Sequence, residues 1–194
     1  MSIAAGFGSN RGYHRSGVWL LGMAMATASL GCDSSSDTEG NEPPPIPSDD
    51  VEYIDFLAPH HQDAIRMADE EIERGASEDV VAMARDMKEV QLAEIETLER
   101  IRADLTGDQT SEADLESQQE DPHMTSDLGR MEDLAGSELD RAFLWEMIPH
   151  HGGAVVVSHR ALPNLEDAEL KDLAETTISA QTREMNAMLD MLEQ

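Results

Sequence analysis

The chain has 194 residues, which allows one domain of ordinary size together with tails. Its 41 acidic residues against 13 basic ones give a formal net charge of −28, and this balance argues against a nucleic-acid partner because phosphate backbones attract the opposite sign. An anionic membrane surface would repel the chain for the same reason.

Residues 1–32 have the layout of an export signal. Arg11 and Arg15 precede an apolar run that begins at Val18, and small residues follow up to Cys32. The run is shorter than the roughly 20 apolar residues of a membrane-spanning helix. The sequence therefore predicts export, to the periplasm or the cell envelope.

Cys32 is the only cysteine, so no intrachain disulfide is possible. It directly follows Leu30 and Gly31, which resembles the lipobox of bacterial lipoproteins, where the cysteine is lipidated and becomes the first residue. We expect a lipid anchor through Cys32 as the only link to a membrane, with plain secretion as the alternative. The proline-rich, acidic stretch 33–49 would then be a disordered tether.

The first helical hairpin is expected over residues 50–105. Apolar side chains recur there at spacings of three and four residues, as on one face of a helix. Gly75 is a stop signal for the first helix, and Ser77 can cap the second. The two helices are predicted near 50–74 and 78–105.

A second hairpin is expected over residues 138–194, after an acidic crossover that covers 106–137. Its helices are predicted near 138–161 and 166–193, with Asn164 as the N-cap of the last helix. No segment alternates polar and apolar residues as a strand does. Two hairpins of this kind bury their apolar stripes against one another, so the predicted fold is all-α, a four-helix bundle with one long crossover.

The two hairpins are an internal repeat with a spacing of 90 residues and no gap. The repeat centres on the triplet Pro59-His60-His61, which matches Pro149-His150-His151. The other identical pairs are Asp50 with Asp140, Ala64 with Ala154, Ala84 with Ala174, Gln91 with Gln181 and Glu94 with Glu184. Both prolines fall inside helical patterns, where each would kink a helix or mark a boundary between two short ones.

Polar residues interrupt the apolar stripe of the second helix in each hairpin, at Gln91 and Glu94 and at their equivalents Gln181 and Glu184. A carboxylate that faces a core is costly unless it is paired, hydrogen-bonded or bound to a metal. With a rise of about 1.5 Å per residue, the antiparallel helices bring Gln91 level with His61. The unusual polar groups are therefore expected in one layer of the bundle.

Two histidine pairs that meet in one layer favour a metal site, whereas a single pair would more often lie on a surface. Met147 lies three and four residues before His150 and His151, so its thioether shares their helix face. Thioether and imidazole together favour copper, particularly Cu(I). The carboxylates favour a di-iron site instead, but that site needs a Glu-x-x-His motif on each of two helices, and no such pair occurs here.

The second hairpin, with Asp140, Phe143, Leu144, Met147-Ile148-Pro149-His150-His151, Ala154, Ala174, Gln181, Glu184 and Met188, resembles the family catalogued as domain of unknown function 305. Its members are exported, ferritin-like four-helix proteins and include copper-binding proteins of the CopM type. The resemblance covers residues 50–194 apart from the crossover. It implies that His60, His61, His150, His151 and Met147 are metal ligands. Leu57 stands in the first hairpin where the family has methionine.

These observations predict an extracytoplasmic metal-binding protein that buffers, sequesters or transfers copper. Gln91, Glu94, Gln181, Glu184 and Met188 would lie around the ligands. No nucleophile–base pair stands out, so we do not expect an enzyme. Two alternatives remain: a structural or interaction module whose histidines and carboxylates form a buried hydrogen-bond layer, and a redox enzyme with a di-metal site.

Overall fold

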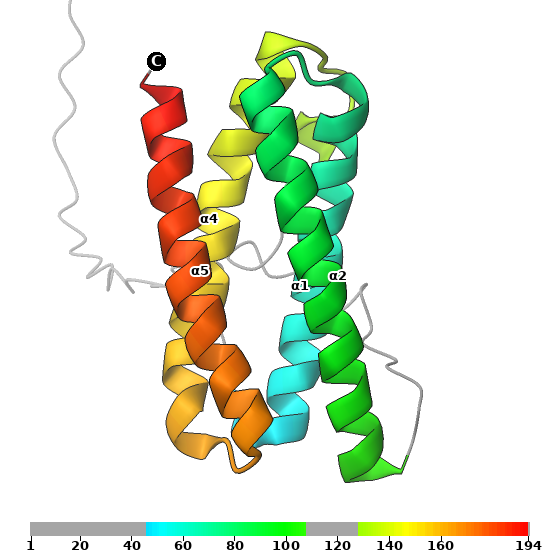
Figure 1. Ribbon diagram of the computed structural model, residues 1–194, viewed down its shortest axis with the longest axis vertical. Helices are drawn as coiled ribbons and strands as arrows, with labels where there is room; N and C mark the ends of the chain where they lie inside the picture. Colours follow the sequence, from blue (N-terminus) through cyan, green and yellow to red (C-terminus); the bar gives the residue numbers. More distant parts are fainter. Residues whose placement is uncertain (1–45, 108–127, 194) are drawn as a thin grey trace, which may run out of the picture. The chain divides into compact units, whose positions relative to one another are not determined.

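The computed structural model describes residues 46–107 and 128–193 (Figure 1). Its helices are α1 (Asp50–Arg74), α2 (Glu78–Thr106), α4 (Ser137–Ala161) and α5 (Ala168–Leu192), with short 3₁₀ turns η1 (Leu128–Arg130) and η2 (Leu162–Asn164). No strand occurs in these two ranges. The predicted all-α four-helix fold is confirmed.

Side-chain caps explain where three of the helices begin. Asp49 accepts a hydrogen bond from the Glu52 amide at the start of α1, and Ser77 accepts one from the Val80 amide at the start of α2. The cap of α5 is Asp167, whose carboxylate accepts from the amide of Leu170 at 2.9 Å.

The prediction that Asn164 caps α5 is therefore wrong. Asn164 ends the 3₁₀ turn η2, three residues before the true cap Asp167. Its side-chain amide donates instead to the carbonyl of Pro47, at 2.9 Å. The proline–asparagine pair ends α4 through this extra turn and leaves the cap to Asp167.

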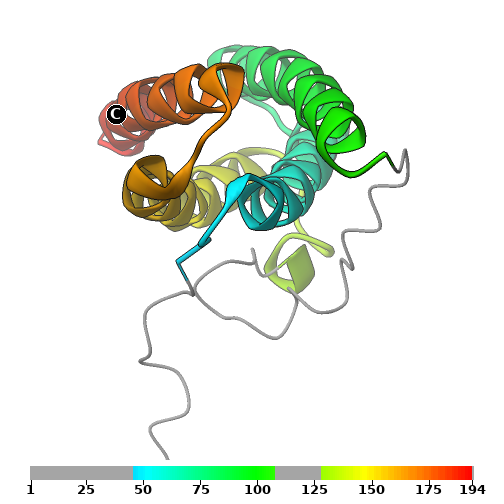
Figure 2. The ribbon, with the colours of Figure 1, turned by 90° about the horizontal axis from the view of Figure 1, so that it is seen from below.

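The four helices pack as two hairpins, α1 with α2 and α4 with α5 (Figures 1 and 2). α1 and α4 make the main contact between the hairpins, whereas α2 and α5 touch only sparsely. α1 and α4 run in opposite directions, as do α2 and α5 (Figure 1). The 90-residue repeat thus becomes a pseudo-two-fold relation between the hairpins.

Asp50 and Asp140 lock the two hairpins together in the same way at opposite ends of the bundle. The Asp140 carboxylate, near the start of α4, accepts from the amides of Ala76 and Ser77 ahead of α2, the first at 2.8 Å. The Asp50 carboxylate, at the start of α1, accepts from the amides of Glu166 and Asp167 at 2.8 and 3.0 Å. These amides lack partners within a helix, so each aspartate satisfies donors of the opposite hairpin.

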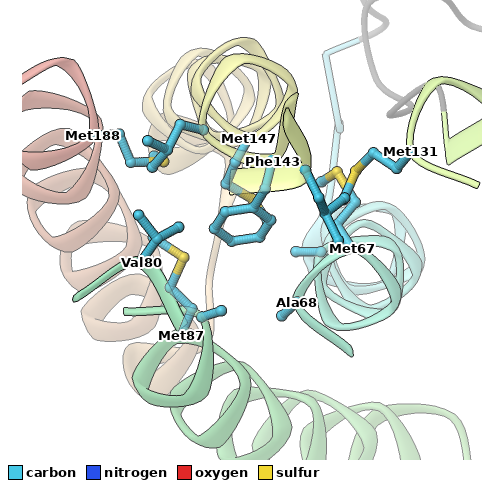
Figure 3. Close-up of a cluster of buried hydrophobic side chains, with 12 residues drawn as sticks. Met67, Ala68, Val80, Met87, Met131, Phe143, Met147 and Met188 are labelled. Carbon is cyan, nitrogen blue, oxygen red and sulfur yellow. The ribbon is translucent and has the colours of Figure 1, made fainter. Parts of the chain in front are cut away.

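The buried side chains form two hydrophobic clusters, which we name the methionine cluster and the aliphatic cluster. The methionine cluster (Figure 3) is Ala64, Met67, Ala68, Val80, Ala84, Met87, Met131, Leu139, Phe143, Leu144, Met147 and Met188. The aliphatic cluster is Tyr53, Ile54, Leu57, Ala58, Leu98, Ile101, Ala154, Ala161, Leu165, Leu170 and Ala174. On both α1 and α4 the histidine pair lies between residues of one cluster and residues of the other. The histidines therefore mark the middle of the bundle.

Both α1 and α4 continue through their prolines, Pro59 and Pro149, so neither proline separates two short helices. Met131, in the expected crossover, is fully buried and belongs to the methionine cluster.

None of the described helices is long and apolar enough to cross a membrane. The export signal with Cys32, most of the tether and the middle of the crossover lie outside the described residues.

Candidate metal centre

Both histidine pairs are buried where α1 and α4 meet. His60 and His61 on α1, and His150 and His151 on α4, each have at most 3% of their surface exposed. The rings of His60 and His150 lie face to face, with centroids 3.8 Å apart and planes tilted by 34°. The structure thus brings together the four histidines that the sequence singled out.

His61 and His151 each contact a glutamate on the second helix of their own hairpin. Nε2 of His61 lies 2.9 Å from Oε2 of Glu94, and Nε2 of His151 lies 2.8 Å from Oε2 of Glu184. The two glutamates are partly exposed, with 12% and 27% of their side-chain surfaces accessible. Each carboxylate therefore links a buried imidazole to the bundle surface.

The other two histidines have different partners, which breaks the two-fold relation. Nε2 of His60 donates to the backbone carbonyl of His150 at 3.1 Å. Nε2 of His150 lies 3.4 Å from Oδ2 of Asp63, and Arg66 donates to the other oxygen of that carboxylate at 2.6 Å. Asp63 was not predicted as a partner of the histidines. It lies three residues after His60, about one helical turn along α1, and this spacing could have indicated that it lies near them.

The hydrogen bonds fix the tautomer of two imidazoles, His60 and His151. Their Nε2 atoms bond to a carbonyl and a carboxylate oxygen, which can only accept, so the ring hydrogen belongs on Nε2 and Nδ1 carries a bare lone pair. Nε2 of His61 and Nε2 of His150 lie near carboxylate oxygens without a hydrogen bond. The Nδ1 atoms of all four histidines are buried without a hydrogen-bond partner. A buried polar atom left unpaired costs about 1–3 kcal/mol, so four of them require an explanation.

Burial also keeps the stacked pair neutral. The pKa of His60 is lowered well below its ordinary value, first by desolvation and then by the neighbouring His150. Desolvation lowers the pKa of His150 as well, against the opposing effect of the Asp63 carboxylate. Neutral imidazole is the form that binds metals, so these two rings need not lose a proton first.

The side-chain oxygens of the two glutamines make no hydrogen bond to the histidines. Gln91 and Gln181 are buried, 3% exposed each, and their Oε1 atoms have no hydrogen-bond partner among the described residues. The histidine at the same height contacts the glutamate one turn along instead. The helical rise sets the level of a Cα atom, whereas side-chain length decides which neighbour is reached.

Met147 is fully buried in the methionine cluster, one helical turn before His150 and His151. Met188 on α5 is equally buried in the same cluster. Figure 3 shows both side chains turned toward the interior of the bundle between α4 and α5. The proposed thioether ligand therefore borders the histidine layer on one side.

Within residues 46–107 and 128–193, no three side chains of His, Cys, Asp or Glu are grouped as around a bound metal ion. Two of the imidazoles are hydrogen-bonded to oxygen acceptors, and the atoms suited to bind an electrophile are the unpartnered imidazole nitrogens and the thioethers of the adjacent cluster. Imidazole nitrogen and thioether sulfur are donors for copper, so the residues present fit this metal.

Comparison with known proteins agrees with this fold. The model of the family described as "Domain of unknown function (DUF305)" matches residues 50–192. The chain is similar to the solved structure "CopM in the Cu(I)-bound form", with 26% identity, TM-score 0.63, and coverage of 74% of this chain and 95% of that one. CopM in the Cu(II)-bound form is 25% identical, with TM-score 0.63 and coverage of 75% and 96%.

A DUF305 protein of Streptomyces coelicolor is 22% identical, with TM-score 0.64 and coverage of 75% of this chain and 93% of that one, and it supports the fold alone. Among curated proteins no relative matches. The family match covers both hairpins and their crossover, so the chain belongs to the DUF305 family.

Proposed function

We propose that the protein binds copper in an extracytoplasmic compartment and acts as a buffer, sequestering agent or carrier of the ion. The observation that carries this proposal is the set of four buried Nδ1 nitrogens without hydrogen-bond partners. It is supported by the likeness to CopM, which has been solved with Cu(I), Cu(II) and silver.

In this proposal His60, His61, His150, His151 and Met147 supply the ligand atoms. Copper bound there would be held by soft and borderline donors, without a proton to displace from Nδ1. The His150 carbonyl and Glu184 keep the ring hydrogen of His60 and His151 on Nε2 and so present Nδ1 of these rings to the metal. Burial of the rings favours retention of the ion over turnover, which is why we propose storage or transfer and no enzymatic activity.

The test is the change of all four histidines to alanine, followed by anaerobic competition with a chromophoric Cu(I) chelator. We expect most of the Cu(I) affinity to be lost. His159→Ala is the matched control, because His159 lies on α4 but is exposed. Unchanged Cu(I) affinity in the four-histidine variant would refute the proposal.

Four cavities in the centre of the bundle could also weaken the fold, so circular dichroism must accompany the titration. Single variants, each losing one histidine, leave three imidazoles in place. In these variants we expect a graded loss of affinity with native helical content. If all four singles are folded and bind as the parent does, the histidine layer is not the copper site.

We further propose that Cys32 attaches the exported protein to a membrane through a lipid. The support is the order of basic, apolar and small residues that ends at Cys32. Export would place the copper site outside the cytoplasm.

A further inference from the structure

The methionines of the bundle lie on one side of the histidine layer. The described residues contain eight methionines, and all eight belong to or pack against the methionine cluster, while the aliphatic cluster contains none. The eight are Met67, Met83, Met87, Met131, Met147, Met185, Met188 and Met191. Figure 3 shows the labelled ones gathered from several helices around Phe143.

The internal repeat shows that packing does not require methionine at these positions. Seven of the eight have an equivalent 90 residues away, on the same framework of helices, and none of these equivalents is methionine. The equivalents, in the same order and without Met131, are Val157, Leu173, Thr177, Leu57, Ile95, Leu98 and Ile101. Methionine often serves as flexible core filler, but the same positions are filled by branched side chains in the other half.

Methionines on this side lie near the segment of α4 that carries the histidines. Met147 lies one turn before His150 and His151, as described above. The sulfur of Met185 lies 3.9 Å from the point where a Cβ atom on Gly152 would be, and Gly152 directly follows His151. Met185 also follows Glu184, whose carboxylate contacts His151.

In the other half the corresponding surroundings of His61 lack sulfur. Gln62 replaces Gly152, and Ile95 replaces Met185. Leu57 replaces Met147. The two histidine pairs are thus equivalent in their backbone and in their glutamate contacts, and they differ in the donors that surround them.

Building on the proposed copper site, we propose that the protein binds one soft monovalent ion, Cu(I), on the methionine side of the histidine layer, and none on the aliphatic side. Of the ligand residues proposed above, this ion would use His151 and Met147, together with Met185, and Met188 on α5 belongs to the same cluster. Thioethers select Cu(I) over harder ions, and branched hydrocarbon side chains offer no donor. The duplication would therefore have retained two scaffolds and one metal site.

The test compares two triple variants that exchange the residues of the two sides. The first, Met147→Leu, Met185→Ile and Met188→Leu, gives the methionine side the residues of the aliphatic side. The second, Leu57→Met, Ile95→Met and Leu98→Met, is the control, because it makes the same three exchanges in reverse on the other side. Swaps of similar volume usually cost less than about 1.5 kcal/mol each, and thermal melts check that both variants fold.

Anaerobic titration with Cu(I) against a chelator measures stoichiometry and affinity. We expect the parent to bind one ion. The first variant should lose at least about tenfold in Cu(I) affinity, because removing groups that only orient the ligands already lowers metal affinity by that factor. The control variant should keep the parental site. Silver(I), which is diamagnetic, should shift the labelled methyl signals of Met147 and Met185 in NMR spectra of the parent.

The outcomes separate the two proposals. A parent that binds no Cu(I) at all refutes the copper function itself. Two equivalent ions in the parent, or undiminished affinity in the first variant, refutes the one-sided site and leaves histidine-dependent copper binding intact. An equal loss in the control variant would assign the effect to core packing and would also overturn the inference.

Discussion

The imidazole ring of His60 lies 3.8 Å from that of His150, although 90 residues separate the two in the chain. The two rings lie where α1 and α4 meet, and both are buried from water. Burial lowers the pKa of both rings, so they can lie face to face without two charges repelling one another. Neutral nitrogen donors are thereby kept in the middle of an acidic protein.

Glu94→Gln and Glu184→Gln distinguish the copper function from a purely structural role. If the carboxylates orient imidazole ligands, the double variant should lose about 10–100-fold in Cu(I) affinity. If the layer is only structural, the variant should change thermal stability and leave copper affinity as it was. Chelator competition and thermal melts on the same samples measure both. Glu96→Gln, on the exposed face of α2, is the control.

Glu71 is expected to make the stability of the fold fall at alkaline pH. Its side chain is buried at the end of α1 beside Asp140, and desolvation followed by the Asp140 carboxylate raises its pKa from 4.5 to about 8. The folded state therefore holds a proton that the unfolded state releases above about pH 4.5. Stability from this proton is complete below that pH and is lost as the pH rises through about 8.

Glu71→Gln should remove this pH dependence, because the amide stays neutral and can still donate to Asp140. The measurement is the free energy of unfolding from denaturant titrations between pH 5 and pH 9. The second hairpin has no such carboxyl group, since Ala161 holds the position equivalent to Glu71. A parent and a Glu71→Gln variant with parallel pH profiles would contradict the prediction.

Asp50→Ala and Asp140→Ala should each destabilise the fold by about 0.5–2 kcal/mol, the range for loss of a helix cap. Each aspartate accepts from two backbone amides of the opposite hairpin, so its loss leaves those donors unpaired. Hydrogen exchange should quicken at Ala76 and Ser77 in the Asp140 variant and at Glu166 and Asp167 in the Asp50 variant. Exchange that quickens at both ends in either variant would show global loosening instead.

Cys32→Ser should release the protein from the membrane fraction of cells that express the full chain. The thiol is the only group that the expected lipid attachment can use, and serine removes it with little change in size. Fractionation and labelling with a fatty-acid analogue measure the effect. Equal membrane association of the two forms would leave plain secretion or another mode of attachment.

The fold was predictable because the repeat has no gap. Apolar stripes of equal register, separated by equal distances, permit few arrangements other than two matched hairpins. The same repeat could have prevented the error at Asn164: the cap Ser77 has Asp167 as its equivalent, and both accept from an amide three residues on. Local helix signals favoured the residue after proline, whereas the duplication pointed to the correct one.

The sequence by itself determined the four helices, the meeting of the histidine pairs and the presence of carboxylates near them, because helical periodicity and rise fix which residues share a face and a height. Only the tertiary structure decided which oxygen each Nε2 lies near, that Asp63 lies beside His150, and that Glu71 is buried beside Asp140. It also decided that all eight described methionines lie on one side of the histidine layer. These features depend on how far side chains reach from one helix to a neighbouring helix. Spacing along one helix carries no information about that distance.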